Sequence, residues 1–437
     1  MARSWFLLLL FEAAGIFEAG LGLLQLTGVC YSGNMLHTMT GTFDNPGPFG
    51  GFVAMCLAVA AGHLWDMRKR EWPPKVVPAV CAILCLLVLP ASLSRAAWIA
   101  ATIAATVFCL TKKEIKEVVF RKKYLATIIS FSLVLLATGG FFLKKDSALG
   151  RLHIWRIECR VIARNPFGVG PGKEMGAYGL EQASFFSKKE RSPLVKRIAG
   201  CPEYAFNEYL KYGMRYGVIG LVLALAISLF ATIRLLRLKS PLAYSMIVLA
   251  VFAFASYPLS IPLFQIAFAL MLAAAAIPLK GKNRSHILFV NCFVAVAVFS
   301  IGVLAGNHFG TENFRSIYET GYALHKECRY DESTAILERG ARISCDPMFH
   351  NIIGKNYCAM GCYDLAEEEF YLARNMVPSR LYPLILLMRM YDEIGKEEFA
   401  LAAANTILAM PVNSKNRNMA DLHAEAAAFV ESHENEK

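Results

Sequence analysis

Two parts of the sequence place arginine where it could bind a phosphate group. In the first, Ser94-Arg95-Ala-Ala-Trp98 begins an apolar run, and a planar guanidinium at such a point suits bidentate binding of phosphate. The alternative is an interfacial arginine that extends towards lipid headgroups beside an aromatic residue. The second part is the polar segment 144–215, which carries fourteen Lys or Arg and seven Asp or Glu residues. Both places could therefore bind an anionic ligand, and for the first the interfacial arginine stays an equal alternative.

Arg151, His153 and Trp155 open a predicted helix over residues 149–164 of this segment. His153 is the only histidine there, and its ordinary pKa suits proton transfer near neutral pH. A single histidine is more often structural, so both interpretations stay open. The helix also carries an arginine stripe that fits either anchoring to lipid phosphates or binding of an anionic substrate. The stripe consists of Arg156, Arg160 and Arg164.

The segment ends in two motifs that could complete a site. Asn165-Pro-Phe-Gly168-Val-Gly170 predicts a rigid turn whose backbone amides could form an anion-binding nest, although a glycine-rich loop alone is a weak signal. Phe206-Asn207-Glu208-Tyr-Leu then leads into an apolar run, and the Glu208 carboxylate is a candidate acid or base.

Apolar runs must hold these motifs in position. The chain is 56% hydrophobic and only 18% charged, and its apolar runs are long enough to cross a bilayer. We expect an all-α bundle of about nine spans, at 5–28, 50–67, 76–94, 96–110, 125–143, 216–233, 242–258, 263–279 and 287–305. Glu12 and Glu18 should face the bundle interior, as acid/base groups or partners of Arg95, because charge in lipid is costly.

Basic connections alternate with less basic ones along this bundle, which predicts a cytoplasmic N-terminus. The loop 144–215 and everything after residue 305 should then lie outside the membrane. The loop is itself basic, either because long loops translocate whatever their charge or because it meets an anionic lipid-linked substrate. The positive surplus of residues 1–305 is explained by membrane anchoring, so we expect membrane lipids and no nucleic acid as partners.

The C-terminal part changes to amphipathic helical pairs. Residues 306–418 show tetratricopeptide-like spacing, since Tyr391 and Ala400 recur 34 residues after Tyr357 and Ala366. We expect a soluble α-solenoid that binds a protein partner, with a plain helical hairpin domain as the alternative. Residues 419–437 form a polar tail, and residues 1–305 form the membrane domain.

The twelve cysteines show no zinc-site spacing, and we expect neither metal nor cofactor. Cys159 and Cys201 both lie in the polar loop. A disulfide between them is one possibility if the loop faces an oxidising compartment.

In order along the chain, these motifs resemble the O-antigen ligase / O-antigen polymerase superfamily of bacterial inner-membrane glycan transferases. The motifs are Gly41-Thr-Phe-Asp-Asn-Pro-Gly-Pro-Phe-Gly50, Ser94-Arg-Ala-Ala-Trp98, the Arg151 to Gly170 region, Phe206-Asn-Glu-Tyr-Leu210 and Tyr216-Gly-Val-Ile-Gly-Leu221. The resemblance implies a GT-C-like, metal-independent transfer from an undecaprenyl-diphosphate-linked glycan at the periplasmic face. Residues matching Arg95 and Arg151 would hold the diphosphate. Further substrate contacts are expected from Ser94, Trp155, Arg156, Asn165, Gly168, Gly170 and Asn207.

Two departures from the family pattern bear on mechanism. Ligases commonly carry His-Asn where this chain has Phe206-Asn207, which leaves Glu208, His153 or arginine-assisted transfer as substitutes for the missing base. The chain also predicts fewer spans than the usual ten to twelve, so early helices are expected to be missing or the start misplaced.

Several functions stay open at this point. The acceptor could be lipid A–core, as in a ligase, another lipid-linked glycan, as in a polymerase, or a protein hydroxyl; we favour the ligase by a small margin. A transporter of lipid-linked sugar is less favoured, because the arginines gather at one edge and the apolar helices show no internal repeat. A non-catalytic scaffold built on the repeats is the remaining alternative.

Overall fold

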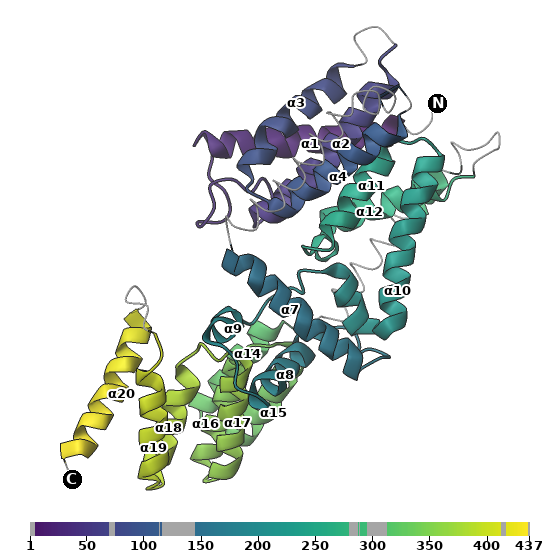
Figure 1. Ribbon diagram of the computed structural model, residues 1–437. Coiled ribbons are helices and arrows are strands. Elements are labelled where there is room, and N and C mark those ends of the chain that lie inside the picture. The colour runs from purple at the N-terminus through teal and green to yellow at the C-terminus, as the bar shows by residue number, and fades with distance from the viewer. Residues whose placement is uncertain are drawn as a thin grey trace. The chain divides into compact units, whose positions relative to one another are not determined.

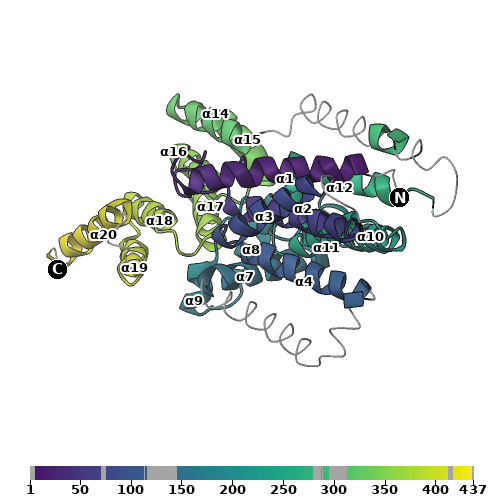
Figure 2. The ribbon, with the colours of Figure 1, turned by 90° about the horizontal axis from the view of Figure 1, so that it is seen from above.

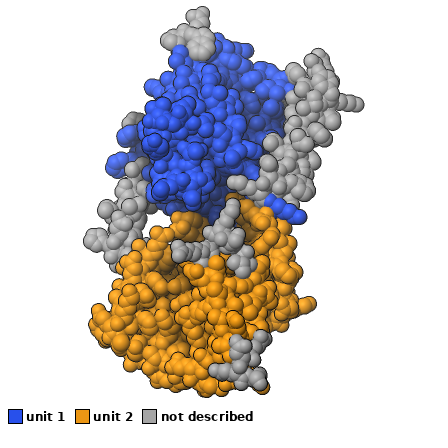
Figure 3. Space-filling view, turned by 90° about the vertical axis from the view of Figure 1, so that its left-hand side faces the viewer, with its two compact units in different colours: residues 1–145, 206–209, 221–309 blue, residues 146–205, 210–220, 310–437 orange. Residues whose placement is uncertain are grey.

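The computed structural model describes residues 5–69, 75–112, 114–115, 145–278, 287, 289–294, 313–411 and 417–435. Those residues form helices and no strand, which confirms the all-α class. The chain makes two compact units, coloured separately in Figure 3. Unit 1 comprises residues 1–145, 206–209 and 221–309, and unit 2 comprises 146–205, 210–220 and 310–437. Most of the polar loop thus groups with the C-terminal helices, whereas the sequence suggested a boundary near residue 305.

Unit 1 is built from apolar helices (Figure 1). They are α1 (Trp5–Leu26), α2 (Pro46–Asp66), α3 (Val76–Ala91), α4 (Arg95–Thr111), the second part of α10 (Glu208–Arg237), α11 (Leu242–Phe252), η1 (Pro258–Ser260) and α12 (Pro262–Ala275). Helix α2 is central, since it packs against α1, α3, α4 and α11. Its glycines and alanines permit this close packing, and most of its residues are buried.

Three of the described helices, α1, α2 and α10, are long and apolar enough to cross a membrane. The helices α3, α4, α11 and α12 are apolar but shorter. Seven of the predicted spans therefore coincide with apolar helices, whereas the span at 125–143 and most of that at 287–305 lie outside the described residues. The second part of α10 exposes Val222, Ile227 and Phe230, as expected for a helix that faces lipid.

Unit 2 contains the helices of the polar loop and those of the C-terminal region. They are α7 (Lys145–Arg164), α8 (Glu174–Ser187), α9 (Pro193–Ile198), α14 (Phe314–Lys326), α15 (Tyr330–Ile343), α16 (Met348–Ala359), α17 (Tyr363–Met376), α18 (Tyr382–Glu393), α19 (Glu397–Leu408) and α20 (Arg417–Asn435). From α14 onward, each helix packs against the next one along the chain, and the succession can be followed in Figures 1 and 2.

One packing contact recurs between these helices. A Cβ added to Gly321 of α14 would lie 2.5 Å from the Leu337 side chain of α15. A Cβ added to Gly354 of α16 would lie 2.4 Å from the Phe370 ring of α17. In both pairs a glycine on the first helix lets a large side chain of the second helix approach its backbone. The two glycines stand 33 residues apart, and so do the two side chains that they contact.

Helix α8 joins the loop to the C-terminal helices within unit 2. A Cβ on Gly176 would lie 2.2 Å from the Arg342 carbonyl oxygen, and one on Gly179 would lie 2.4 Å from the Met376 methyl group. Gln182 lies further along the same helix and donates from Nε2 to the carbonyl oxygens of Gly200 (2.9 Å) and Met376 (2.5 Å). The C-terminal helices are therefore packed onto the loop through glycine and backbone contacts.

Candidate functional site

The segment 40–50 is held in place by polar side chains of α1. Gln25 accepts hydrogen bonds at Oε1 from the backbone amides of Thr40 (2.9 Å) and Gly41 (2.8 Å). Glu18 accepts from the Thr42 amide (3.0 Å) and the Thr42 hydroxyl (2.5 Å). These two buried side chains position the loop that leads into α2. The sequence singled out Glu18 but not Gln25, because an amide in an apolar run is a weak signal.

Glu12 contacts a different helix of unit 1. Its Oε1 lies 2.6 Å from Nδ1 of His63, and both side chains are buried. The sequence had suggested Glu12 and Glu18 as acid/base groups or partners of Arg95. The structure instead pairs Glu12 with His63 of α2 and Glu18 with Thr42 of the 40–44 loop.

The connection between α3 and α4 forms a tight corner against the start of α2. Leu93 has a positive φ of 50°, which costs energy for a residue with a side chain. Ser94 donates its hydroxyl to the Gly47 carbonyl oxygen (3.2 Å). A Cβ added to Gly50 would lie 2.7 Å from Ser94 Cβ, so only glycine permits this approach. Gly47 and Gly50 at the start of α2 thus hold the corner between α3 and α4 rigidly.

Arg95 is the first residue of α4 and is partly buried. The Ser94 side chain makes no capping hydrogen bond to α4. A helix start without a side-chain cap presents backbone amides and the positive end of the helix dipole, both of which favour an anion. The guanidinium of Arg95 adds a full positive charge at that point.

The Phe206-Asn207-Glu208 motif lies in unit 1 beside the connection from α11 to α12. Phe206 has a positive φ of 49°, and its ring packs against Tyr257 with ring centres 5.4 Å apart. Glu208 begins α10, and its amide donates to the Ala253 carbonyl oxygen (2.9 Å). Asn207 and Glu208 are both buried. The left-handed backbone conformation of Phe206, next to two buried polar residues, indicates local backbone strain. Such strain is common at functional sites.

Aromatic contacts bring these segments of unit 1 to the same end of α2. Phe43, from the 40–50 loop, packs against Phe264 at the start of α12, with ring centres 5.9 Å apart. Phe252, at the end of α11, lies against Gly51 in the first turns of α2. Because Ser94 contacts Gly47 and Gly50 of α2, and the Glu208 amide bonds to Ala253 next to Phe252, these two segments lie at one end of the bundle.

Three backbone amides of the glycine-rich turn of unit 2 already have acceptors within the protein. The amides of Gly168, Val169 and Gly170 donate to the carbonyl oxygens of Asn165 (2.8 Å), Met214 (2.8 Å) and Arg215 (3.1 Å). Gly168 and Gly217 both have positive φ, and a Cβ on Gly217 would lie 2.0 Å from the Pro166 carbonyl oxygen. The turn therefore packs backbone to backbone against a break in α10. This corrects the expectation of an anion-binding nest.

Helix α7 confirms the helix predicted over residues 149–164. Arg151 and Trp155 are partly buried on it, and Arg156 is exposed. His153 is buried against Phe185 and Phe186, and its Nε2 lies 3.0 Å from Oε1 of Gln182. Burial lowers the pKa of His153 below its ordinary value. These surroundings favour a structural imidazole.

Two arginines of the stripe on α7 share one carboxylate. Arg160 donates from Nε to Glu181 Oε1 of α8 (2.6 Å), and Arg164 forms an ion pair with the other oxygen of the same group. Glu181 is buried, whereas both arginines are partly exposed. The stripe thus serves helix packing as well as surface charge, since Arg156 and Arg164 are exposed.

Glu158 is a buried residue that the sequence reasoning missed. It is fully buried on α7, and neither carboxyl oxygen has a hydrogen-bond partner among the described residues. Desolvation raises its pKa well above the ordinary value, because burial disfavours the charged form. Its position one residue before exposed Cys159 gave no signal, because a glutamate on an amphipathic helix normally faces water.

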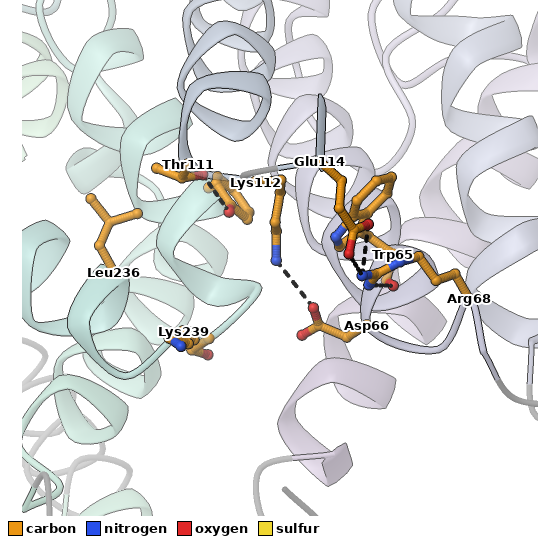
Figure 4. Close-up of a pocket in the computed structure, with 10 residues that line it drawn as sticks. Trp65, Asp66, Arg68, Thr111, Lys112, Glu114, Leu236 and Lys239 are labelled. Atoms are coloured by element: carbon orange, nitrogen blue, oxygen red, sulfur yellow. Dashed lines mark hydrogen bonds and ion pairs between the residues drawn. The ribbon is translucent and has the colours of Figure 1, made fainter. Parts of the chain in front are cut away.

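A pocket of about 500 Å³ lies at the opposite end of α2 (Figure 4). Four of its charged side chains form ion pairs: Lys112 with Asp66 (3.1 Å) and Arg68 with Glu114 (2.7 Å). A cytoplasmic location of this basic end is a prediction from the sequence, and the pocket lies away from the motifs above. In the described part of the chain, no cluster of three His, Cys, Asp or Glu residues could hold a metal ion.

Residues 80–225 match the family model described as O-antigen ligase. This stretch, about a third of the chain, is similar to O-antigen ligase domains. It extends from α3 into α10, across both units. Comparison with curated proteins and with solved structures gave no match. The domain implies glycan transfer of the ligase or polymerase type from lipid-linked glycans, and together with the apolar helices it indicates an integral membrane protein.

Residues 80–225 contain the candidate catalytic and substrate-contact residues taken from the sequence, whereas Glu12 and Glu18 lie before them. Unit 1 holds Ser94, Arg95, Asn207 and Glu208, and unit 2 holds Arg151, His153, Trp155, Arg156, Asn165, Gly168 and Gly170. Within unit 1 the four residues gather at one end of the bundle. Within unit 2 the candidates are distributed along α7 and the turn that follows it.

Proposed function

We propose that this protein transfers a glycan from undecaprenyl diphosphate to an acceptor hydroxyl at the periplasmic face of the inner membrane, as an O-antigen ligase does. The match over residues 80–225 supports transfer of the ligase or polymerase type. The ligase direction is the finer part of the proposal. The N-terminus lies in the cytoplasm, and the loop 144–215 and the C-terminal helices lie in the periplasm.

The observation that carries the proposal is Arg95 at the start of α4, where Ser94 makes no capping bond. A diphosphate leaving group gains negative charge as the sugar departs. A guanidinium and helix-terminal amides that are held in place before the reaction stabilise that charge without reorganising. The bond from Ser94 to Gly47 and the close packing of Gly50 supply this rigidity.

The remaining candidates take different roles. Arg151 is the second arginine for the donor, and Trp155, Arg156, Asn165 and Asn207 contact the substrate. Glu208 is the residue best placed in unit 1 to accept the acceptor's proton, since it lies beside the strained Phe206. His153 is held by Gln182 inside unit 2, so we assign it a positioning role for α7 and α8. Gly168 and Gly170 shape the turn rather than bind the donor through their amides.

We further propose that helices α14 to α19 are tetratricopeptide-like repeats that recruit a protein partner or a protein acceptor. The recurrent glycine contacts of Gly321 and Gly354 support the repeat. Because these helices pack on α8, a bound partner would be held beside the O-antigen ligase domain's own loop.

The test is the lipid-linked glycan pool of a deletion strain, sized by mass spectrometry. Long polymers that accumulate on undecaprenyl diphosphate indicate a ligase, and single repeat units indicate a polymerase. A normal pool with unglycosylated proteins indicates protein glycosylation. An unchanged pool with unchanged surface glycans would contradict the proposal and favour a scaffold.

Complementation separates catalysis from scaffolding. The wild-type gene should restore the pool, and Arg95→Ala should fail to do so while the protein is present in the membrane at normal level. Arg68→Ala, at the opposite end of α2, is the matched control and should restore it. Full restoration by Arg95→Ala would favour the scaffold.

A further inference from the structure

Two cysteines far apart in the sequence meet inside unit 2. Cys201 follows α9 in the polar loop, and Cys345 follows α15 in the C-terminal region. Their sulfur atoms are 2.7 Å apart although the residues are 144 positions apart. A disulfide has a sulfur–sulfur distance of about 2.05 Å, so a shift of less than about 1 Å would join them.

The surroundings of the pair fit a covalent link. Cys345 is buried in a cluster with Tyr178 and Met376, whereas Cys201 is partly exposed at the edge of that cluster. The sequence had suggested Cys159 as the partner of Cys201. Cys159 is exposed on α7, and it is Cys345 that lies against Cys201.

We propose that Cys201 and Cys345 form a disulfide that fastens the C-terminal helices to the loop of the O-antigen ligase domain. The inference rests on the periplasmic placement of unit 2 in the proposed function, because a disulfide forms and persists in an oxidising compartment. It goes beyond glycan transfer in assigning a covalent modification to two residues outside the candidate site.

The reaction is an exchange with the disulfide of a periplasmic thiol–disulfide oxidoreductase. The exposed Cys201 thiolate attacks one sulfur of that disulfide and forms a mixed disulfide, which releases one oxidoreductase thiolate. The Cys345 thiolate then attacks Cys201 and releases the second. The two protons of the cysteine thiols end on the oxidoreductase thiols, so the protein loses two electrons and the oxidoreductase gains them.

The disulfide would lie beside contacts that already join the two regions. Gln182 bonds to Gly200, next to Cys201, and to Met376 of α17. Tyr178 donates its hydroxyl to the same Gln182 Oε1 (2.7 Å). The disulfide would therefore reinforce packing between the loop and the C-terminal helices that the Gln182 contacts already establish.

The test counts free thiols in the full-length protein in membranes. The protein is alkylated under denaturing conditions without reductant, then reduced, alkylated with a second reagent and mapped by mass spectrometry. We expect ten of the twelve cysteines to take the first reagent, and Cys201 and Cys345 to take only the second. Twelve thiols reactive before reduction, or a disulfide mapped to another pair, would overturn the proposal.

Single variants provide matched controls. Cys201→Ser and Cys345→Ser should each free the remaining partner, so that all eleven cysteines react at once. Cys159→Ser should leave two cysteines protected, which excludes the pair first suggested by the sequence. In a strain that lacks the periplasmic oxidoreductase, all twelve thiols should react.

Glycan transfer measured on the same membranes separates this inference from the proposed function. Normal transfer with twelve free thiols would overturn the disulfide and leave the transferase intact. A protected pair without transfer would support the disulfide and count against the transferase.

Discussion

The two Asn-Pro turns of this chain have similar sequences and opposite relations to their helices. Asn45-Pro46 begins α2, with Asn45 Oδ1 accepting from the Gly47 amide (2.8 Å). Asn165-Pro166 ends α7, with the Asn165 side chain donating to the Val161 carbonyl oxygen (3.0 Å). The first turn supports the corner that presents Arg95 at a helix start. In the second, the amides of Val169 and Gly170 donate to carbonyl oxygens of α10. Whether such a turn can bind an anion depends on where its amides point, which glycine content does not reveal.

The largest effect is expected at the first turn. Arg95→Ala should reduce glycan transfer about 100-fold or more, because a preorganised charge at the leaving group is lost. The measurement is transfer from a purified lipid-linked donor in proteoliposomes. Arg95→Lys should recover part of the rate, since it keeps the charge but loses the bidentate geometry. A fully active Arg95→Ala enzyme would place the diphosphate elsewhere.

Substitutions of glycines at the second turn should change the stability of the protein. Gly217→Ala should lower the free energy of unfolding by about 3 kcal/mol, because the new Cβ meets the Pro166 carbonyl oxygen in a backbone conformation nearly exclusive to glycine. Gly170→Ala, with no atom within 4 Å of its Cβ, should cost only about 1 kcal/mol. Chemical denaturation in detergent measures both. Equal losses would mean that the contact with α10 contributes little.

Glu158, on the helix that the second turn ends, should make stability depend on pH. Its folded-state pKa is raised by desolvation, so the folded state holds more protons than the unfolded state between the two pKa values. Stability should therefore fall as pH rises from the unfolded pKa through the folded one. The variant Glu158→Gln should unfold at a temperature that changes less between pH 5 and pH 8. Identical slopes in both proteins would show that the carboxyl is solvated.

The smallest effect is expected at an exposed lysine near the second turn. Lys173 is exposed just after the second turn, where an anion-binding nest would have placed it near the donor. Lys173→Ala should change the KM for the lipid-linked donor by less than about twofold, as expected of an exposed side chain away from the site. A tenfold increase would restore the nest hypothesis.

The sequence was sufficient to predict most of the helices, but not the contacts between residues far apart in the chain. Apolar runs gave the helices of unit 1, and the arginine spacing gave α7. The amides of the second turn could not be assigned, because their acceptors Met214 and Arg215 lie more than forty residues away on another helix. The same holds for Cys201 with Cys345 and for Gln182 with Met376, whose separations are 144 and 194 residues. Local periodicity carries no record of contacts over such distances.

The bond from Gln182 to Met376 also constrains the order of synthesis. Translation at about 5–20 residues per second would need roughly 10–40 s to make the chain between them. During that time α8 is complete, yet its glycine face has nothing to pack against. The backbone along the glycine face of α8 therefore stays exposed until residue 376 has been synthesised. A ribosome that stalls before residue 376 would leave an unfinished protein open to proteolysis.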